Sequence, residues 1–174
     1  MGRVFVVVLL LLSFAPGCAT QRPPAGLAMP APDEARAASL LAGYLLAQGW
    51  TVRLADAALV EAAREGERLR LEPQLDPSGL DRIIVTRTWP RDPQADEAVL
   101  QSFALELNDA LNVGQFRTDA TGLVFQSSLP FLGELEPRLL DAFLAYSAAV
   151  RFAVLQVQGD RRLLAPVEDG ETSR

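Results

Sequence analysis

Two short segments separated by a strong turn signal constrain the fold of this chain most. Residues 67–73 alternate between charged and apolar side chains, and residues 80–89 are rich in Ile, Val and Thr. Between them, residues 76–79 read Asp-Pro-Ser-Gly, a combination typical of a tight turn. Alternation with a period of two predicts strands, so we expect these segments to pair as an antiparallel hairpin.

Three amphipathic segments predict helices around this hairpin. The first begins with an acidic pair at 33–34 and ends at Gly49, the second runs from about residue 92 to 112–114, and the third runs from about 136 to 157. Apolar side chains recur at helical spacing in all three: Ala35, Ala38, Leu41, Leu45 and Leu46 in the first; Val99, Leu100, Phe103, Leu107 and Leu111 in the second; Leu139, Leu140, Phe143, Leu144, Ser147, Val150 and Val154 in the third.

Further strands are expected between these helices. Residues 50–55 alternate, with Trp50 packing at the base of the strand, and residues 57–64 fit helix and strand equally well. Residues 115–118 and 123–129 predict a second hairpin around a turn at 119–122, ended by Pro130. The expected order, α-β-β-β-α-β-β-α, predicts an α+β domain over residues 33–167, with an antiparallel sheet packed against helices.

Several stretches of the second half resemble the YbjN family. They are Phe-Ala-Leu-Glu-Leu-Asn at 103–108, Leu-Asn-Val-Gly-Gln-Phe at 111–116, residues 119–125 with Gly122, and Leu-Pro-Phe at 129–131 before a long last helix. The resemblance spans roughly residues 33–157, and its motifs are structural rather than catalytic. It implies a fold similar to the chaperones of type III secretion and a non-enzymatic role in binding or assembly.

The N-terminus predicts export and a lipid anchor. Residues 1–17 carry one positive charge at Arg3 and an apolar run too short to span a bilayer, which is typical of a signal peptide. Residues 15–18, Ala-Pro-Gly-Cys, resemble the lipobox of bacterial lipoproteins, which implies acyl chains, such as palmitate, on Cys18. The alternatives are a plain secretory signal with a leftover thiol, or a buried core cysteine.

The segments that flank the domain predict where it works. Residues 18–32 are rich in Pro and Ala and predict a tether, and the polar residues 168–174 predict a flexible tail. Ala19 follows the cysteine, and in enteric-type lipoproteins this pattern implies sorting to the outer membrane. We therefore expect a lipid-anchored protein of the bacterial cell envelope that faces the periplasm.

Composition excludes several classes of function. The formal net charge is −6, all sixteen basic residues are Arg, and no basic run occurs, so we expect no nucleic-acid partner. The chain has no His, and we expect its one Cys to carry lipid, which removes Ser-His and Cys-His nucleophiles and His-based metal sites. We expect no catalytic residue, no metal and no cofactor.

Carboxylates remain as possible acids and bases. The candidates are Asp56, Glu61, Asp92, Asp96, Glu97, Glu134 and Glu136. A hydrolase of cell-wall or glycan material would need two of them about 5 to 9.5 Å apart across a cleft. Acids at helix starts more simply bind free backbone N–H groups, and residues 119–122 hold too few carboxylates for a calcium loop.

Three features suggest surfaces for a partner. Arg87, Trp89 and Arg91 could bind an acidic peptide or a lipid head group. The alternative is a Trp that caps the core with a solvated Arg on either side. Asn108 and Asn112 could bind a peptide backbone, although a helix C-cap is the simpler role for Asn112. The last helix stays apolar beyond its core stripe, at Phe143, Tyr146, Phe152 and Leu155, which permits a homodimer.

The leading expectation is a membrane-tethered binding or assembly domain that handles an extended peptide along a sheet edge. The alternatives are the carboxylate-dependent hydrolase and a purely structural envelope protein.

Overall fold

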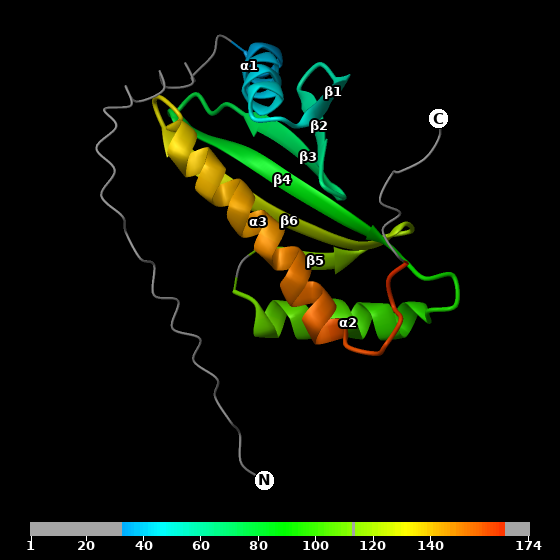
Figure 1. The fold of residues 1–174 in the computed structure, drawn as a ribbon. Coiled ribbons are helices and arrows are strands. Elements are labelled where there is room, and N and C mark those ends of the chain that lie inside the picture. Colours follow the sequence, from blue (N-terminus) through cyan, green and yellow to red (C-terminus); the bar gives the residue numbers. More distant parts are fainter. Residues whose placement is uncertain (1–32, 113, 166–174) are drawn as a thin grey trace, which may run out of the picture.

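The described part of the chain, residues 33–112 and 114–165 of a computed structural model, contains three helices and one six-stranded antiparallel sheet (Figure 1). The elements are α1 (Glu34–Ala47), β1 (Thr51–Asp56), β2 (Leu59–Arg64), β3 (Glu67–Gln74), β4 (Leu80–Pro90), α2 (Glu97–Ala110), β5 (Gln115–Thr118), β6 (Gly122–Leu132) and α3 (Pro137–Gln158). The predicted α+β class is confirmed. The predicted signal peptide, Cys18, the tether and the tail from residue 168 lie outside the described residues.

The sheet has one strand more than the expected order. Strand β2 occupies residues 59–64, where the sequence favoured neither helix nor strand, and it pairs with β1 on one side and β3 on the other. Val60 and Ala62 are buried on the helix side, so the alternation of a strand prevails over the helix propensity of the Ala and Glu residues. Glu65 and Gly66, with φ of 51° and 73°, form the tight turn to β3.

Pro130 does not end the second hairpin, contrary to the prediction. Strand β6 continues to Leu132 and pairs with β4 along its whole length, with Pro130 opposite Arg82. Strand β5 pairs only with residues 123–126 of β6, so beyond that point one side of β6 is an edge. A proline is tolerated there because an edge strand does not need the missing N–H group for pairing.

The helices begin where the sequence predicts. The carboxylate of Asp33 accepts a hydrogen bond of 2.7 Å from the Arg36 N–H group, and that of Asp96 accepts one of 2.8 Å from the Ala98 N–H group. The predicted core stripes are correct at most positions. Four side chains placed on them are exposed instead, because each lies to one side of the buried stripe: Ala35, Leu46, Val99 and Leu139.

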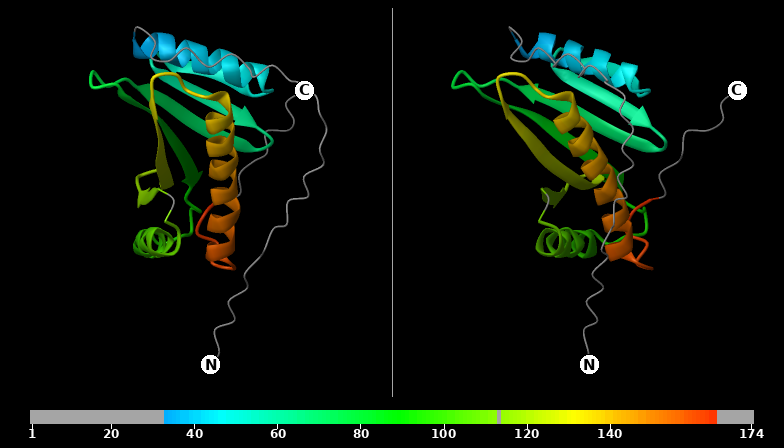
Figure 2. Two further views of the ribbon diagram at one scale, coloured as in Figure 1. Left: turned by 90° about the vertical axis from the view of Figure 1, so that its left-hand side faces the viewer. Right: turned by 60° about the vertical axis from the view of Figure 1, so that its left-hand side comes forward.

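The helices contribute to cores on one face of the sheet only (Figure 2). The first core joins α1, the middle of the sheet and the first half of α3, including Leu41, Leu71 and Leu140. The second joins α2, the start of β6 and the second half of α3, including Phe103 and Phe125. Helix α3 therefore links both cores.

Among the described helices, α3 alone has the length and apolarity of a membrane-spanning segment. Its buried side chains, which include Leu140, Leu144, Val150 and Val154, pack in the two cores. A core helix of a folded domain passes the same test of length and composition.

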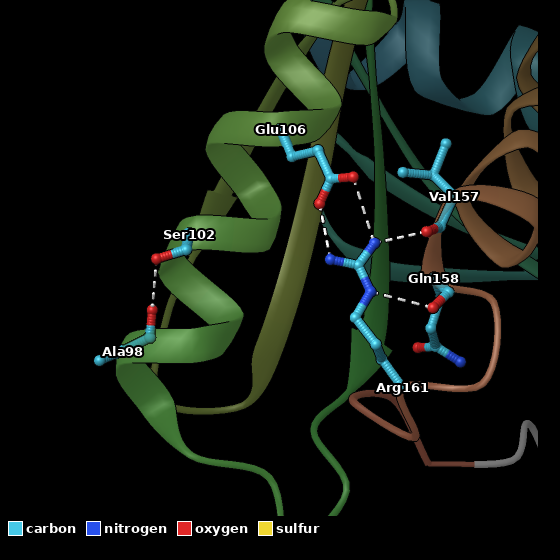
Figure 3. A network of polar contacts seen from close by, with 6 residues as sticks. All are labelled: Ala98, Ser102, Glu106, Val157, Gln158 and Arg161. Carbon is cyan, nitrogen blue, oxygen red and sulfur yellow. Dashed lines mark hydrogen bonds and ion pairs between the residues drawn. The ribbon is translucent and has the colours of Figure 1, made fainter. Parts of the chain in front are cut away.

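Arg161, three residues after the end of α3, forms polar contacts with both α3 and α2 (Figure 3). Its guanidinium forms an ion pair of 2.6 Å with Glu106 on α2 and donates hydrogen bonds to the carbonyl groups of Val157 and Gln158. It also lies 5.0 Å from the centre of the Phe103 ring. The hydrogen bond from Arg161 is the main cause of a lowered pKa at Glu106, so this carboxylate stays ionised.

Candidate functional site

The structure buries two of the three residues predicted to bind a partner. Arg87 and Trp89 are 4% and 3% exposed and face the helices, whereas Arg91 is half-exposed and lies 3.8 Å from Glu97. A partner could stack on Trp89 only if the second core opened. The position of Trp89 matches the simpler alternative, a Trp that covers the core, but Arg87 is buried where that alternative expected a solvated Arg. The partner-binding role stays a prediction.

Arg87 lies between the two apolar cores. It follows Val85 of the first core and precedes Trp89 of the second, and its guanidinium forms an ion pair with Glu67. Burial, followed by the nearby charge of Arg151, lowers the pKa of Arg87 to about 10, so the group is charged at neutral pH. Glu67 supplies the counter-charge that a buried cation needs.

Asn108 binds a peptide backbone, but that of its own chain. Its side-chain amide donates a hydrogen bond of 2.8 Å to the Phe116 carbonyl group and accepts one of 2.8 Å from the Phe116 N–H group. Phe116 lies on β5, at the end of the sheet order, so Asn108 closes this edge. Asn112 is exposed, and the C-cap of α2 is Leu111 rather than Asn112.

The candidate acids are spread over separate elements and are bonded locally. Three of them, Asp56, Asp92 and Asp96, accept hydrogen bonds from backbone N–H groups one to three residues away. Glu61 and Glu97 form ion pairs. Glu136 is the N-cap residue of α3, and Glu134 is exposed. Within residues 33–112 and 114–165, no three Cys, Asp or Glu residues gather as metal ligands would.

The face of the sheet opposite the helices is open and carries a row of charged and polar side chains. In register across the strands, Arg53 of β1 lies opposite Glu61 of β2, Glu61 opposite Arg70 of β3, and Arg70 opposite Thr86 of β4. A second row, one step along the strands, contains Thr51, Ala63 and Arg68. Because alternate residues of a strand share a face, both rows project from the same side.

These rows line a hollow of about 560 Å³, which we call the arginine groove and define by Arg53, Glu61, Arg68, Arg70, Thr86 and Thr88. Glu61 forms ion pairs with Arg53 and with Arg70, the latter at 3.6 Å. The side chains of Arg53 and Arg70 are 72% and 57% exposed, so solvent weakens both pairs. With three Arg and one Glu, the groove is cationic on a chain whose formal net charge is −6.

The arginine groove adjoins the other edge of the sheet. Strand β1 ends the sheet order and pairs with β2 alone, and every β1 residue except Val52 is exposed. In the part of the chain that the structure describes, Asn108 covers the β5 edge, whereas the outer edge of β1 is uncovered. An extended peptide could therefore reach β1 and the groove together.

The outward face of α3 is a second exposed surface. Its exposed large apolar side chains lie along both sides of the buried stripe: Leu139 and Tyr146, 43% and 36% exposed, on one side, and Phe152 and Leu155, 71% and 45% exposed, on the other. No charged residue occurs between Asp141 and Arg151 on this helix. This face is unlike the open sheet face, because it offers apolar rather than charged contacts.

Comparisons with protein-family models, with curated proteins and with solved structures find no match to this chain. The resemblance to the YbjN family therefore stays a prediction. Sequence reasoning missed the arginine groove, although residues 67–73 contained its signal: Arg68 and Arg70 alternate with buried Leu69 and Leu71. The groove also needs Arg53 and Glu61, and only the register of β2 brings these next to Arg70.

Proposed function

We propose that this protein is a non-enzymatic binding domain of the bacterial cell envelope, whose arginine groove binds an acidic, extended segment of a partner protein. The cationic groove on the open sheet face is the observation that carries the proposal. Guanidinium groups bind carboxylates with paired hydrogen bonds, and the hydroxyl groups of Thr86 and Thr88 add neutral contacts.

The shape of the surface favours an extended ligand. The groove crosses four neighbouring strands, from Thr51 and Arg53 on β1 to Thr86 and Thr88 on β4. At about 4.8 Å between strands, this width corresponds to four or five extended residues. Residues of the ligand beyond the groove could turn to run along β1 and pair with its uncovered edge, in the manner of strand addition.

The anchor in this proposal comes from the sequence. A lipid on Cys18, followed by the Pro-rich and Ala-rich residues up to 32, would hold the domain near a membrane, and Ala19 favours the outer membrane. Two acyl chains suffice for stable attachment. Incorporation of labelled palmitate, present in the natural chain and lost in Cys18→Ala, tests this part of the proposal.

We also propose that a second copy of the chain packs on the outward face of α3. The exposed side chain of Phe152 lies on the same side of α3 as the exposed small residues Ala142, Ala145 and Ala149, and it would meet these alanines of an antiparallel copy. The stretch between Asp141 and Arg151 would bury no charge in such a pair. This contact leaves the arginine groove free, because the groove lies on the opposite face of the sheet.

Fluorescence anisotropy of a labelled ten-residue oligoglutamate tests the groove. The full chain is purified in uncharged detergent and compared with Arg68→Gln/Arg70→Gln. The matched control, Arg36→Gln/Arg138→Gln, removes the same charge from exposed positions on the helices. We expect the groove variant to lose about tenfold in affinity, or roughly 1.4 kcal/mol, and the control to change less than about twofold. Equal losses in the groove variant and in the control would overturn the proposal.

A further inference from the structure

The last described residues run along the end of β4. The Ala165 N–H group donates a hydrogen bond of 2.8 Å to the Pro90 carbonyl group, and Leu164 forms an antiparallel bridge with Arg91. Because the bridge is antiparallel, Leu164 and Ala165 run in the direction from Arg91 to Pro90, opposite to that of β4.

The hydrogen bonds of β4 show on which side this segment lies. The Arg91 N–H group donates to the Thr121 carbonyl group, on the β6 side, at 3.0 Å. The Pro90 carbonyl and the Arg91 N–H group belong to one peptide plane and point in opposite directions. Ala165 therefore lies on the other side of β4, in line with β3.

Strand β3 occupies the position beside β4 into which a straight continuation from Ala165 would run. It begins at Glu67, and extension of the register from the Arg70–Thr86 pair places Arg68 opposite Thr88. A segment that continued straight from Ala165 in the plane of the sheet would collide with Glu67, so only a path out of that plane is open. Pro166 has no N–H group with which to extend the pairing.

The two faces of the sheet differ at this point. On the helix face, Trp89, Leu163 and Leu164 are already buried in the second core. On the open face, the next side chains are Thr88 and Arg68, which form the near end of the arginine groove. The open face therefore offers both space and positive charge.

The segment that follows carries the complementary charge. Residues 166–174 include Glu168, Asp169 and Glu171. At about 3.3 Å per extended residue, Glu168 lies within about 10 Å of Ala165 and Glu171 within about 20 Å. Adjacent strands are about 4.8 Å apart, so these lengths reach Arg68 and Arg70 on β3 and then Arg53 on β1.

From this path and this charge we infer that residues 166–174 dock in the arginine groove of their own chain, with Glu168, Asp169 and Glu171 on its arginines. The segment acts as a built-in competitor that an acidic partner must displace. A competitor joined by so short a connection has an effective concentration in the millimolar range, so even weak docking reduces the apparent affinity for a partner. This inference rests on the proposed function, since both place an acidic segment in the same groove.

The test compares the full chain with Glu168→Gln/Asp169→Asn/Glu171→Gln. The matched control, Asp109→Asn/Glu134→Gln/Asp160→Asn, removes three exposed acids elsewhere. Two quantities are measured: the affinity for the labelled oligoglutamate, and the backbone amide resonances of Arg68, Arg70 and Thr88 without any ligand. We expect the tail variant to bind roughly tenfold more tightly than the natural chain and to shift these resonances, and the control to do neither.

Other outcomes separate this inference from the function on which it rests. If oligoglutamate binds the natural chain and the tail variant equally and the resonances do not move, the docked tail is wrong and the groove still binds acidic segments. If the resonances move but oligoglutamate binds none of the variants, the tail docks and the proposed partner class is wrong. Equal tightening by the control variant would overturn the docked tail, because overall charge alone would then explain the effect.

Discussion

The side-chain amide of Asn108 forms two hydrogen bonds, each of 2.8 Å, with the backbone N–H and carbonyl groups of Phe116. In this way a side chain of α2 satisfies backbone groups on the outer edge of β5 that a further strand would otherwise pair with. The opposite edge, β1, has no such cover among the described residues. The two ends of the sheet therefore differ, and the uncovered end is the one that adjoins the arginine groove.

Replacement of Asn108 should destabilise the domain. Asn108→Ala leaves the Phe116 N–H and carbonyl groups without these partners, at an expected cost of about 1 to 3 kcal/mol in the free energy of unfolding. Asn112→Ala is the control, because Asn112 is exposed just beyond α2, and we expect a change within about 0.5 kcal/mol. Urea denaturation measures both, and equal effects would contradict the role of Asn108.

Gly122 should tolerate no side chain. Its φ is +150°, and a Cβ atom there would lie 2.1 Å from the Trp89 carbonyl oxygen and 2.6 Å from the Arg91 nitrogen. We expect Gly122→Ala to cost about 3 kcal/mol or more, since both atoms belong to backbone that must shift. Gly43→Ala in α1 meets nothing within 4 Å and should stabilise by about 0.5 to 1 kcal/mol. Thermal unfolding of both variants checks this contrast.

Ionisation of Tyr44 should lower the free energy of unfolding at alkaline pH. Burial, together with its hydrogen bond of 2.7 Å to Asp141, raises the pKa of Tyr44 to about 12. The folded protein thus holds the phenol proton more tightly than the unfolded chain, where the pKa is near 10. The contribution is complete below about pH 10 and is lost as the pH rises toward 12.

Denaturation of the natural chain and of Tyr44→Phe at several pH values measures this dependence. The difference in unfolding free energy between the two proteins should be constant from about pH 8 to 10 and should then shift against the natural chain. A constant difference up to about pH 12 would contradict the assigned hydrogen bond. Asp141→Asn, which removes the charge of the acceptor, should weaken the dependence.

Removal of one partner of the buried ion pair between Arg87 and Glu67 should lower the free energy of unfolding strongly, whereas replacement of both partners by apolar residues should lower it little. Glu67→Gln leaves the Arg87 charge without its counter-charge, and we expect a loss of about 3 to 5 kcal/mol. The double variant Glu67→Leu/Arg87→Met should recover most of that loss, because no buried charge remains. Glu61→Gln, which affects only exposed pairs, should cost about 1 kcal/mol or less. A double variant as unstable as Glu67→Gln would contradict this account.

The outward face of α3 should control the oligomeric state. Phe152 is 71% exposed, and Phe152→Glu would place a charge in the middle of the proposed contact between two copies. We expect sedimentation of the full chain in uncharged detergent to change from dimer to monomer. Gln156→Glu adds the same charge one turn later and should act more weakly. A natural chain that is monomeric at all concentrations would contradict the dimer.

Local sequence patterns predicted most of the elements, because each rests on contacts between near neighbours. Asp33 and Asp96 identified helix starts, and the turn at residues 76–79 identified a hairpin. One question that the sequence left open, the structure of residues 59–64, and one prediction that failed, the end of the second hairpin at Pro130, are both decided by distant pairing. Strand β2 exists because β1 and β3 flank it, and β6 continues through Pro130 because β5 is short.

The candidate site was less predictable for the same reason. Arg87 and Trp89 form an attractive surface cluster in the sequence, but the side chains of a strand face the helices or the solvent according to parity, and these two face the helices. The arginine groove combines residues from four strands. Its members become neighbours only through the register, which no single segment encodes.

The measurement that tests the central claim most directly is a map of where an acidic peptide binds. Amide resonances of the full chain, in uncharged detergent, are followed as unlabelled ten-residue oligoglutamate is added. We predict that the largest shifts occur at Arg53, Arg68, Arg70 and Thr88, and that added salt reverses them. Shifts confined to α2 and α3, or none at saturating peptide, would contradict a binding function for the open face of the sheet.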